Sequence, residues 1–270
     1  MRTVILTACM VFALTYMSKP CFAHDFGLGN EKKYAPPGRF ERDIKHFEAS
    51  DKKQPPPKDA IVCIGSSSMR GWHGTIHTDL APLTLIPRGF GGSNMNDALH
   101  YADRIVLSYK PRAIVIYEGD NDVAQGISPE KISDTFRKFV NKVHKQLPQC
   151  RIYFLSIKPS IKRWHLWSNM KDANSLIAAE CAKDNRLTFV DVASGMLNSE
   201  GNPRKNIFKK DNLHMTRDGY LIWRNTLKPI LMKSELQYDK QKPAKLTEAK
   251  EQTSNKDLKE TDKSAPYFRR

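Results

Sequence analysis

Short apolar runs alternate with longer segments of helical periodicity between about residues 60 and 231, and this alternation constrains the fold more than any other feature. The apolar runs are brief and rich in β-branched or aromatic residues, as strands are, and they cover 60–64, 83–86, 113–117, 152–156 and 188–190. The segments with helical spacing cover 40–49, 96–108, 129–146, 169–183 and 216–232. No linker interrupts the series, so the sequence predicts an α/β domain with a parallel sheet.

The first 23 residues have the pattern of a cleavable secretory signal. Arg2 precedes an apolar stretch from Val4 to Tyr16, and the segment closes on small and apolar residues at Ala23. The apolar stretch is short for a membrane span, so we expect cleavage after Ala23 and no stable membrane span afterwards. The protein is therefore predicted to be exported, to the periplasm or the medium.

The rest of the chain divides by composition into three parts. Residues 24–58 form an N-terminal extension with a short helix that ends before three consecutive prolines, and residues 59–233 form the α/β domain. Residues 234–270 are dominated by charged and polar side chains, with Lys and Glu foremost, and are predicted to be a disordered tail.

The formal charge of +15 lies mainly on the part that folds. The signal carries two bases, and the segment from Lys233 onward carries ten bases and seven acids, which leaves +10 on the residues between them. Such a surface suits an anionic envelope polysaccharide or anionic lipid. A nucleic-acid partner is not expected, because an exported protein rarely meets nucleic acid and the sequence has neither an Arg-rich helix nor a basic strand interleaved with aromatic residues.

The three cysteines beyond the signal do not form a disulfide framework. Cys63 lies in an apolar strand, where it is expected to be a small core residue. Pairing of Cys150 with Cys181 is left open.

The first predicted strand stops at Gly65 and is followed by three serines, Ser66 to Ser68. In a parallel sheet, groups at the carboxyl ends of strands face the ligand crevice, and the next helix offers unpaired backbone N–H donors. One of these serines is therefore a candidate nucleophile. The alternative is that they serve as helix caps.

Three later loops hold groups that a serine nucleophile needs. Asp211 precedes His214 by three residues, a spacing that lets the carboxylate orient the imidazole as a base. The loop after the second strand contains Gly91 and Gly92, which allow close approach of the backbone to a substrate. Asn121, after the third strand, supplies an amide donor for an oxyanion. Turn formation and capping are the alternatives for the glycines and the asparagine, and helix entry for the aspartate.

Together these loops resemble the four sequence blocks of the SGNH hydrolases, also called the GDSL-type esterase/lipase superfamily, over about residues 61–220. The resemblance implies that Ser67 is the nucleophile, with Asp211 and His214 completing the triad. It also implies an oxyanion hole made of the Ser67 and Gly92 N–H groups and the Asn121 side chain. The implied fold is a three-layer α/β/α, flavodoxin-like arrangement with a five-stranded parallel sheet and no metal or cofactor.

The first block departs from the usual Gly-Asp-Ser-Leu, because Ser66 stands at the aspartate position. Gly-Ser-Ser-Ser followed by Arg70 and Trp72 resembles a bacterial subgroup of secreted members. In the second block, Pro87 stands where an asparagine is usual.

Four side chains near the blocks are candidates for contact with substrate: Arg70, Trp72, Trp164 and Trp167. The two later tryptophans follow the fourth strand, where they could stack on a sugar ring or bind an acyl chain. Simple packing is the alternative for both. The histidines near the motifs, such as His73, have no metal-ligand spacing, so no metal site is predicted.

The sequence thus predicts a serine esterase that hydrolyses a short-chain acyl ester, with acetyl on a glycan preferred over a long-chain lipid. An O-acyltransferase acting on an envelope polysaccharide would use the same residues. A lysophospholipase or thioesterase is a further alternative, as is a non-catalytic binding module for an anionic glycan or lipid.

Overall fold

The computed structural model describes residues 32–240, so the predicted signal peptide and the tail beyond residue 240 lie outside the described residues. Five parallel strands form one sheet in the order β2-β1-β3-β4-β5. Their bounds are β1 Ile61–Gly65, β2 Leu85–Gly89, β3 Ala113–Tyr117, β4 Arg151–Leu155 and β5 Leu187–Val190. This arrangement confirms the predicted α/β fold with a flavodoxin-like sheet.

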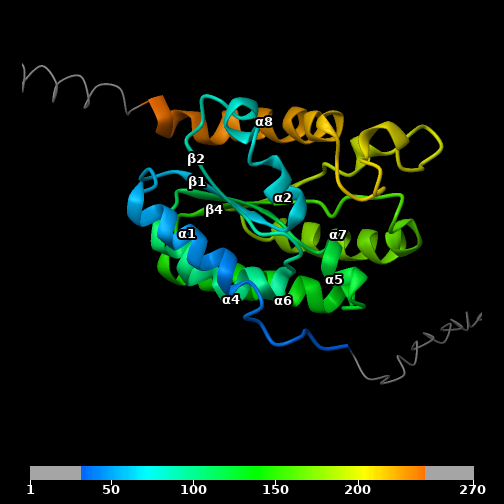
Figure 1. Cartoon of the computed structure of the whole chain (residues 1–270), viewed down its shortest axis with the longest axis horizontal. Helices are drawn as coiled ribbons and strands as arrows, with labels where there is room; N and C mark the ends of the chain where they lie inside the picture. Colours follow the sequence, from blue (N-terminus) through cyan, green and yellow to red (C-terminus); the bar gives the residue numbers. More distant parts are fainter. Residues whose placement is uncertain (1–31, 241–270) are drawn as a thin grey trace, which may run out of the picture. The chain divides into compact units, whose positions relative to one another are not determined.

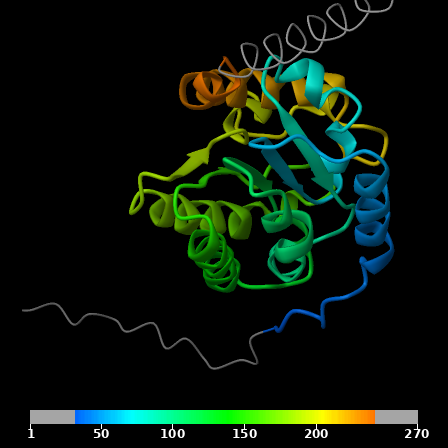
Figure 2. The same ribbon diagram turned by 90° about the vertical axis from the view of Figure 1, so that its left-hand side faces the viewer.

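Helices cover both faces of the sheet and complete the three layers (Figure 1). One face carries α1 Glu41–Lys53, α4 Met95–Ile105, α6 Pro129–Gln146 and α7 Trp167–Cys181. The other face carries α2 Ser67–Trp72, α3 Ile76–Asp79 and α8 Arg217–Lys240. Figure 2 shows α8, in orange, and α6, in green, on opposite sides of the sheet. A short helix, α5 Asp120–Ala124, follows β3, and 3₁₀ turns cover Leu107–Tyr109, Trp164–Leu166, Ser194–Met196 and Lys205–Ile207.

The hydrophobic core consists of two clusters, one on each face of the sheet. Alternate residues of a strand supply them: Val62 and Ile64 belong to the cluster under α4 and α6, whereas Ile61 and Cys63 belong to the cluster under α8. Because both faces are covered, β1 and β3 are buried at every position and read as continuous apolar runs.

For the longer elements, the bounds predicted from the sequence agree closely with those in the structure. The helix at 129–146 and the strand at 113–117 match their predicted bounds, and the Ser128 side chain caps α6 at its Pro129 start. The short helices α2, α3 and α5 are absent from the predicted ranges, because four to six residues show no helical period.

The predicted start of the disordered tail at residue 234 is wrong, because α8 continues to Lys240. Glu235 is fully buried and accepts hydrogen bonds from Arg151 and from the Tyr153 hydroxyl, at 2.7 Å for the latter. Asp239 accepts a 2.6 Å bond from the Thr84 hydroxyl, just before β2. From the sequence, these charged residues are predicted to belong to the tail, but they pair with charged and hydroxyl groups near the amino ends of the strands.

The connections leaving β1 and β3 run to opposite faces of the sheet, through α2 and α3 in one case and α6 in the other. This reversal leaves a crevice at the carboxyl ends of the two neighbouring strands. Among residues 32–240, no helix is long and apolar enough to cross a membrane. Cys63, Cys150 and Cys181 are buried and free.

Candidate active site

Ser67 is the first residue of α2, directly beyond the carboxyl end of β1. Ser66 is the N-cap residue, but its side chain makes no capping hydrogen bond. Ser68 is buried, whereas Ser67 is partly exposed. The first N–H groups of a helix have no partner within the helix, so Ser67 combines an accessible hydroxyl with a backbone donor.

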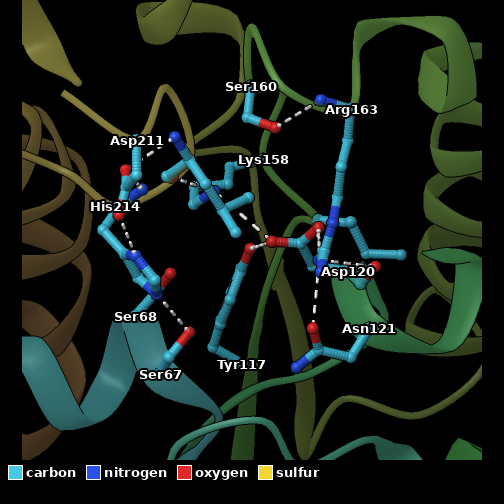
Figure 3. Close-up of polar contacts among 12 residues, drawn as sticks. Ser67, Ser68, Tyr117, Asp120, Asn121, Lys158, Ser160, Arg163, Asp211 and His214 are labelled. Atoms are coloured by element: carbon cyan, nitrogen blue, oxygen red, sulfur yellow. Dashed lines mark hydrogen bonds and ion pairs between the residues drawn. The ribbon is translucent and has the colours of Figure 1, made fainter. Parts of the chain in front are cut away.

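His214 reaches Ser67 from the loop that precedes α8 (Figure 3). Its Nε2 lies 3.0 Å from the Ser67 Oγ, and its Nδ1 lies 2.6 Å from Oδ2 of Asp211. The Nδ1–H donates to the carboxylate, which leaves the Nε2 lone pair free to accept the serine proton. The three side chains named from the sequence therefore lie in hydrogen-bonding order.

Asp211 is held by the backbone of its own loop. Its Oδ1 accepts hydrogen bonds from the N–H groups of Leu213 at 3.0 Å and of His214 at 2.9 Å. The bond to the His214 side chain and these backbone bonds hold the pKa of Asp211 well below its usual range. The carboxylate is thus ionised. Because 43% of its side-chain surface is exposed, hydrogen bonds orient it more than burial does.

Gly92 and Asn121 lie on neighbouring loops of the crevice. Gly92 has a φ of +94°, a left-handed conformation that favours glycine, and a Cβ there would meet only the Phe40 ring at 3.9 Å. Backbone conformation, more than lack of space, therefore requires a glycine here. Asn121 lies in the first turn of α5, and its Nδ2 donates a 2.8 Å bond to the Ser93 carbonyl. The second Nδ2 hydrogen remains available to a ligand.

The register of the sheet explains why these loops meet. Gly65 at the end of β1 pairs with Gly89 of β2 and with Tyr117 of β3. The loops that carry Ser67, Gly92 and Asn121 therefore leave the same edge of the sheet from three adjacent strands.

The other acids of the third block support the loop. Asp122 accepts bonds from the backbone N–H groups of Met95 at 3.0 Å and Gly119 at 3.0 Å, which ties β3 to the start of α4. Glu118 is fully buried, and its Oε1 accepts a 2.6 Å bond from the Ser93 hydroxyl. Burial, reinforced by the charge of Asp122, raises the pKa of Glu118 far above its usual range.

Two basic side chains from the loop after β4 also reach the site, and sequence reasoning missed them. Lys158 is fully buried, with its Nζ 3.0 Å from the Leu213 carbonyl, and Arg163 donates a 2.6 Å bond to Asp120 Oδ1. Burial lowers the pKa of Lys158, although Asp120 opposes the shift. The signal that could have revealed Lys158 is a lysine between Ile157 and Pro159, directly after an apolar strand.

The four predicted substrate contacts separate into two groups. Trp72 is fully buried, so the prediction that it contacts substrate is wrong; its Nε1 donates a 2.7 Å bond to Asp79, and its ring stacks on Tyr220. Arg70 is exposed beside the second loop, where a Cβ on Gly91 would lie 3.1 Å from its Nη1. Trp164 and Trp167 are partly exposed and stack with ring centroids 5.9 Å apart.

Trp164 also lines a cavity of about 640 Å³. The loop 198–206 also lines this cavity, with three asparagines, Glu200 and the basic residues Arg204 and Lys205. The backbone N–H of Lys162 donates a 3.0 Å bond to the Asn212 carbonyl, so the segment that carries Trp164 lies against the histidine loop. Within residues 32–240, no group of three or more His, Cys, Asp or Glu side chains is placed to hold a metal ion.

The profile of the GDSL-like lipase/acylhydrolase family matches residues 60–222 of the chain. No curated protein matches it. Three solved structures illustrate the similarity of fold. A GDSL-like lipase from Bacteroides thetaiotaomicron is 21% identical, with a TM-score of 0.60 over 71% of this chain and 98% of the other. An alpha/beta hydrolase from the metagenome of Lake Arreo, Spain, is 15% identical, with a TM-score of 0.54 over 64% and 94%. A catalytic mutant of an acetylxylan esterase from Geobacillus stearothermophilus is 13% identical, with a TM-score of 0.52 over 64% and 93%.

Proposed function

The chain belongs to the GDSL-like lipase/acylhydrolase family, and we propose that within this family of carboxylic ester hydrolases it is a serine esterase for short-chain acyl esters, with acetylated carbohydrates as the preferred substrates. The observation that carries the proposal is the chain of hydrogen bonds from Asp211 through His214 to the Ser67 hydroxyl. Such a chain supplies a nucleophile, its base and the group that orients the base.

In the proposed reaction, the Ser67 Oγ attacks the ester carbonyl carbon while its proton passes to Nε2 of His214. Asp211 stabilises the imidazolium that forms. As the tetrahedral intermediate collapses, the bond to the alcohol oxygen breaks and His214 returns the proton to the leaving alkoxide. Water, deprotonated by His214, then attacks the acyl-enzyme, and the carboxylic acid leaves as Ser67 recovers its proton.

The negative charge that develops on the carbonyl oxygen needs fixed donors. The N–H groups of Ser67 and Gly92 and the free Nδ2 hydrogen of Asn121 are proposed to supply them. Loss of one such donor typically costs about 10²–10³ in kcat. We therefore expect Asn121→Ala to lower kcat by roughly this factor.

A short acyl group is favoured by the surface of the described residues. Among residues 32–240, Leu176 and Tyr238 are the large hydrophobic side chains with the most exposed surface, at 38% and 39%, and neither lies on the loops that carry Ser67, Gly92, Asn121 and His214. The acetylxylan esterase of similar fold agrees with this preference.

A carbohydrate is favoured as the alcohol because of the cavity beside Trp164. Tryptophan faces stack on sugar rings, and the asparagine side chains of the loop 198–206 can donate to and accept from hydroxyl groups. We also propose export, because the apolar stretch after Arg2 has the pattern of a signal. The basic charge of the chain would then favour anionic envelope polymers as partners.

A series of p-nitrophenyl esters from acetate to palmitate, together with acetylated xylo-oligosaccharides, tests the proposal. We expect kcat/KM to fall as the acyl chain lengthens beyond butyryl, acetate to be released from the oligosaccharide, and both activities to be lost in Ser67→Ala. A rise in kcat/KM toward palmitate would favour a lysophospholipase or thioesterase instead. Release of acetate only when an acceptor glycan is present would favour acyl transfer.

A further inference from the structure

The loop after β4 places two cations on one buried carboxylate (Figure 3). Arg163 Nη1 lies 2.6 Å from Oδ1 of Asp120, and Lys158 Nζ lies 3.4 Å from its Oδ2. The side chain of Lys158 has no exposed surface, and those of Asp120 and Arg163 are 7% and 19% exposed. A buried cation is costly unless it is paired and hydrogen-bonded, so an arrangement that brings two of them to one acid calls for a reason.

Arg163 also contacts the amide expected to bind the oxyanion. The same Nη1 donates to Oδ1 of Asn121 at 3.0 Å and to the Asp120 carbonyl at 3.1 Å. A guanidinium cannot accept a hydrogen bond, so it fixes the amide with the oxygen toward Arg163 and Nδ2 toward Ser93. The flipped amide would bring an N–H group against the cation and would leave the Ser93 carbonyl without this donor.

The charge of Arg163 has a second effect on Asn121. A cation on the amide oxygen draws electron density from the amide nitrogen, which makes the Nδ2 hydrogens stronger donors. The free Nδ2 hydrogen is the one expected to meet the developing oxyanion. The contact therefore acts in the direction that transition-state stabilisation requires.

Lys158 connects the same loop to the base. Its Nζ donates a 3.0 Å bond to the carbonyl of Leu213, the residue before His214. Ser160 Oγ accepts a 3.2 Å bond from the Arg163 N–H, which fixes the turn between the two basic residues. One short loop thus contacts both the amide side and the histidine side of the site.

We propose that Arg163 is a positioning residue that fixes and polarises the Asn121 amide, with Asp120 and Lys158 anchoring it to the histidine loop. The inference rests on the proposed esterase function, because it assigns Arg163 a role in the same transition state. Arg163 itself contacts neither the Ser67–His214 pair nor the ester carbonyl in this proposal, and it acts only through Asn121.

A double-mutant cycle with Arg163→Gln and Asn121→Ala tests the proposal on p-nitrophenyl acetate. We expect Arg163→Gln alone to lower kcat by about 10- to 100-fold with a KM change below about 3-fold, a smaller loss than complete removal of a donor. In the Asn121→Ala background, the same substitution should change kcat by less than about 3-fold, because its target is already absent. Arg163→Lys keeps the charge but not the planar guanidinium with its Nη1 donor, and we expect an intermediate kcat.

Arg137→Gln is the matched control, since Arg137 is an exposed arginine on α6 paired with Asp134, and it should leave kcat unchanged. Thermal unfolding of each variant shows whether it is folded, and Arg163→Lys replaces Arg163→Gln in the cycle if the latter unfolds. Equal losses of kcat in both backgrounds, or an unchanged kcat in the single variant, would overturn the positioning role. If the Ser67→Ala variant hydrolysed the ester at the wild-type rate, that result would instead overturn the proposed function, and the inference with it.

Discussion

The Nε2 of His214 lies 3.0 Å from the Ser67 hydroxyl oxygen, although 147 positions separate the two residues in the chain. The docking of α8 on α2 makes this contact. Tyr220, in the first turns of α8, donates a 2.9 Å hydrogen bond to the Ser68 carbonyl, and its ring stacks on Trp72. The loop that carries His214 is thereby held above the start of α2.

Asp211→Asn should lower kcat by about 10³–10⁴-fold with little change in KM. An amide at this position can donate to Nδ1, which favours the imidazole tautomer with its proton on Nε2, where it cannot accept the serine proton. Steady-state kinetics on p-nitrophenyl acetate measure the effect. A loss below about tenfold would mean that the backbone of the loop, and not the carboxylate, orients His214.

Trp72 and Trp164 should respond oppositely to substitution. Trp72→Phe removes the bond to Asp79 from a fully buried ring, and we expect it to destabilise the fold by about 1–2 kcal/mol without a change in KM. Trp164→Ala should raise KM for an acetylated oligosaccharide by about 3- to 10-fold while leaving p-nitrophenyl acetate unaffected. Chemical denaturation and kinetics on both substrates distinguish the two roles. An equal effect of Trp164→Ala on both substrates would argue against a sugar subsite.

The sheet, the longer helices and the relation of Asp211 to His214 could be predicted from the sequence, because buried strands and residues close together in the chain produce local sequence patterns. Burial of a single side chain leaves no such pattern. Trp72, in a short helix, was interpreted as a substrate contact, but its ring packs on Tyr220 of α8. Glu235 was interpreted as part of a charged tail, but it pairs with Tyr153, 82 residues away. Arg163 was missed for the same reason, because its contact with Asn121 spans 42 residues.

The end of α8 should set the shortest stable chain. A stop after Lys240 keeps the contacts of Glu235 and Asp239, and we expect the wild-type free energy of unfolding. A stop after Lys233 removes Glu235, so that Arg151 and the buried Arg112, 7% exposed, lose this partner. We expect the free energy of unfolding to fall by about 3 kcal/mol or more. Urea denaturation of both truncations compares them directly. Equal stability of the two would mean that this ion cluster contributes nothing net.

His73 should make the fold less stable in acid. Burial, with the nearby charges of Arg88 and Arg70, lowers the pKa of His73 to about 4, and its Nε2 accepts a 2.9 Å bond from the Gly89 N–H. The unfolded chain binds this proton near pH 6.5 and the folded chain only near 4, so stability falls as the pH drops from about 6.5 to about 4. Above this window the group contributes no pH dependence.

His73→Gln keeps an acceptor for Gly89 but does not titrate, so the difference in unfolding free energy between wild type and variant should change across that window by about 3 kcal/mol. The pKa of Asp122 is raised by burial to about 6, so its protonation increases stability as the pH falls. This contribution is present in both proteins and cancels in the difference. A difference that stays constant from pH 4 to pH 7 would contradict the assignment to His73.

The identity of the nucleophile is tested most directly by covalent labelling with a p-nitrophenyl alkylphosphonate, a reagent that phosphonylates activated serines. Mass spectrometry of the digested protein should show one adduct, on the peptide that contains Ser67, formed in parallel with the loss of esterase activity. Ser67→Ala should take up no label. Labelling at another residue, or full activity in the labelled protein, would contradict the assignment of Ser67 as the catalytic nucleophile.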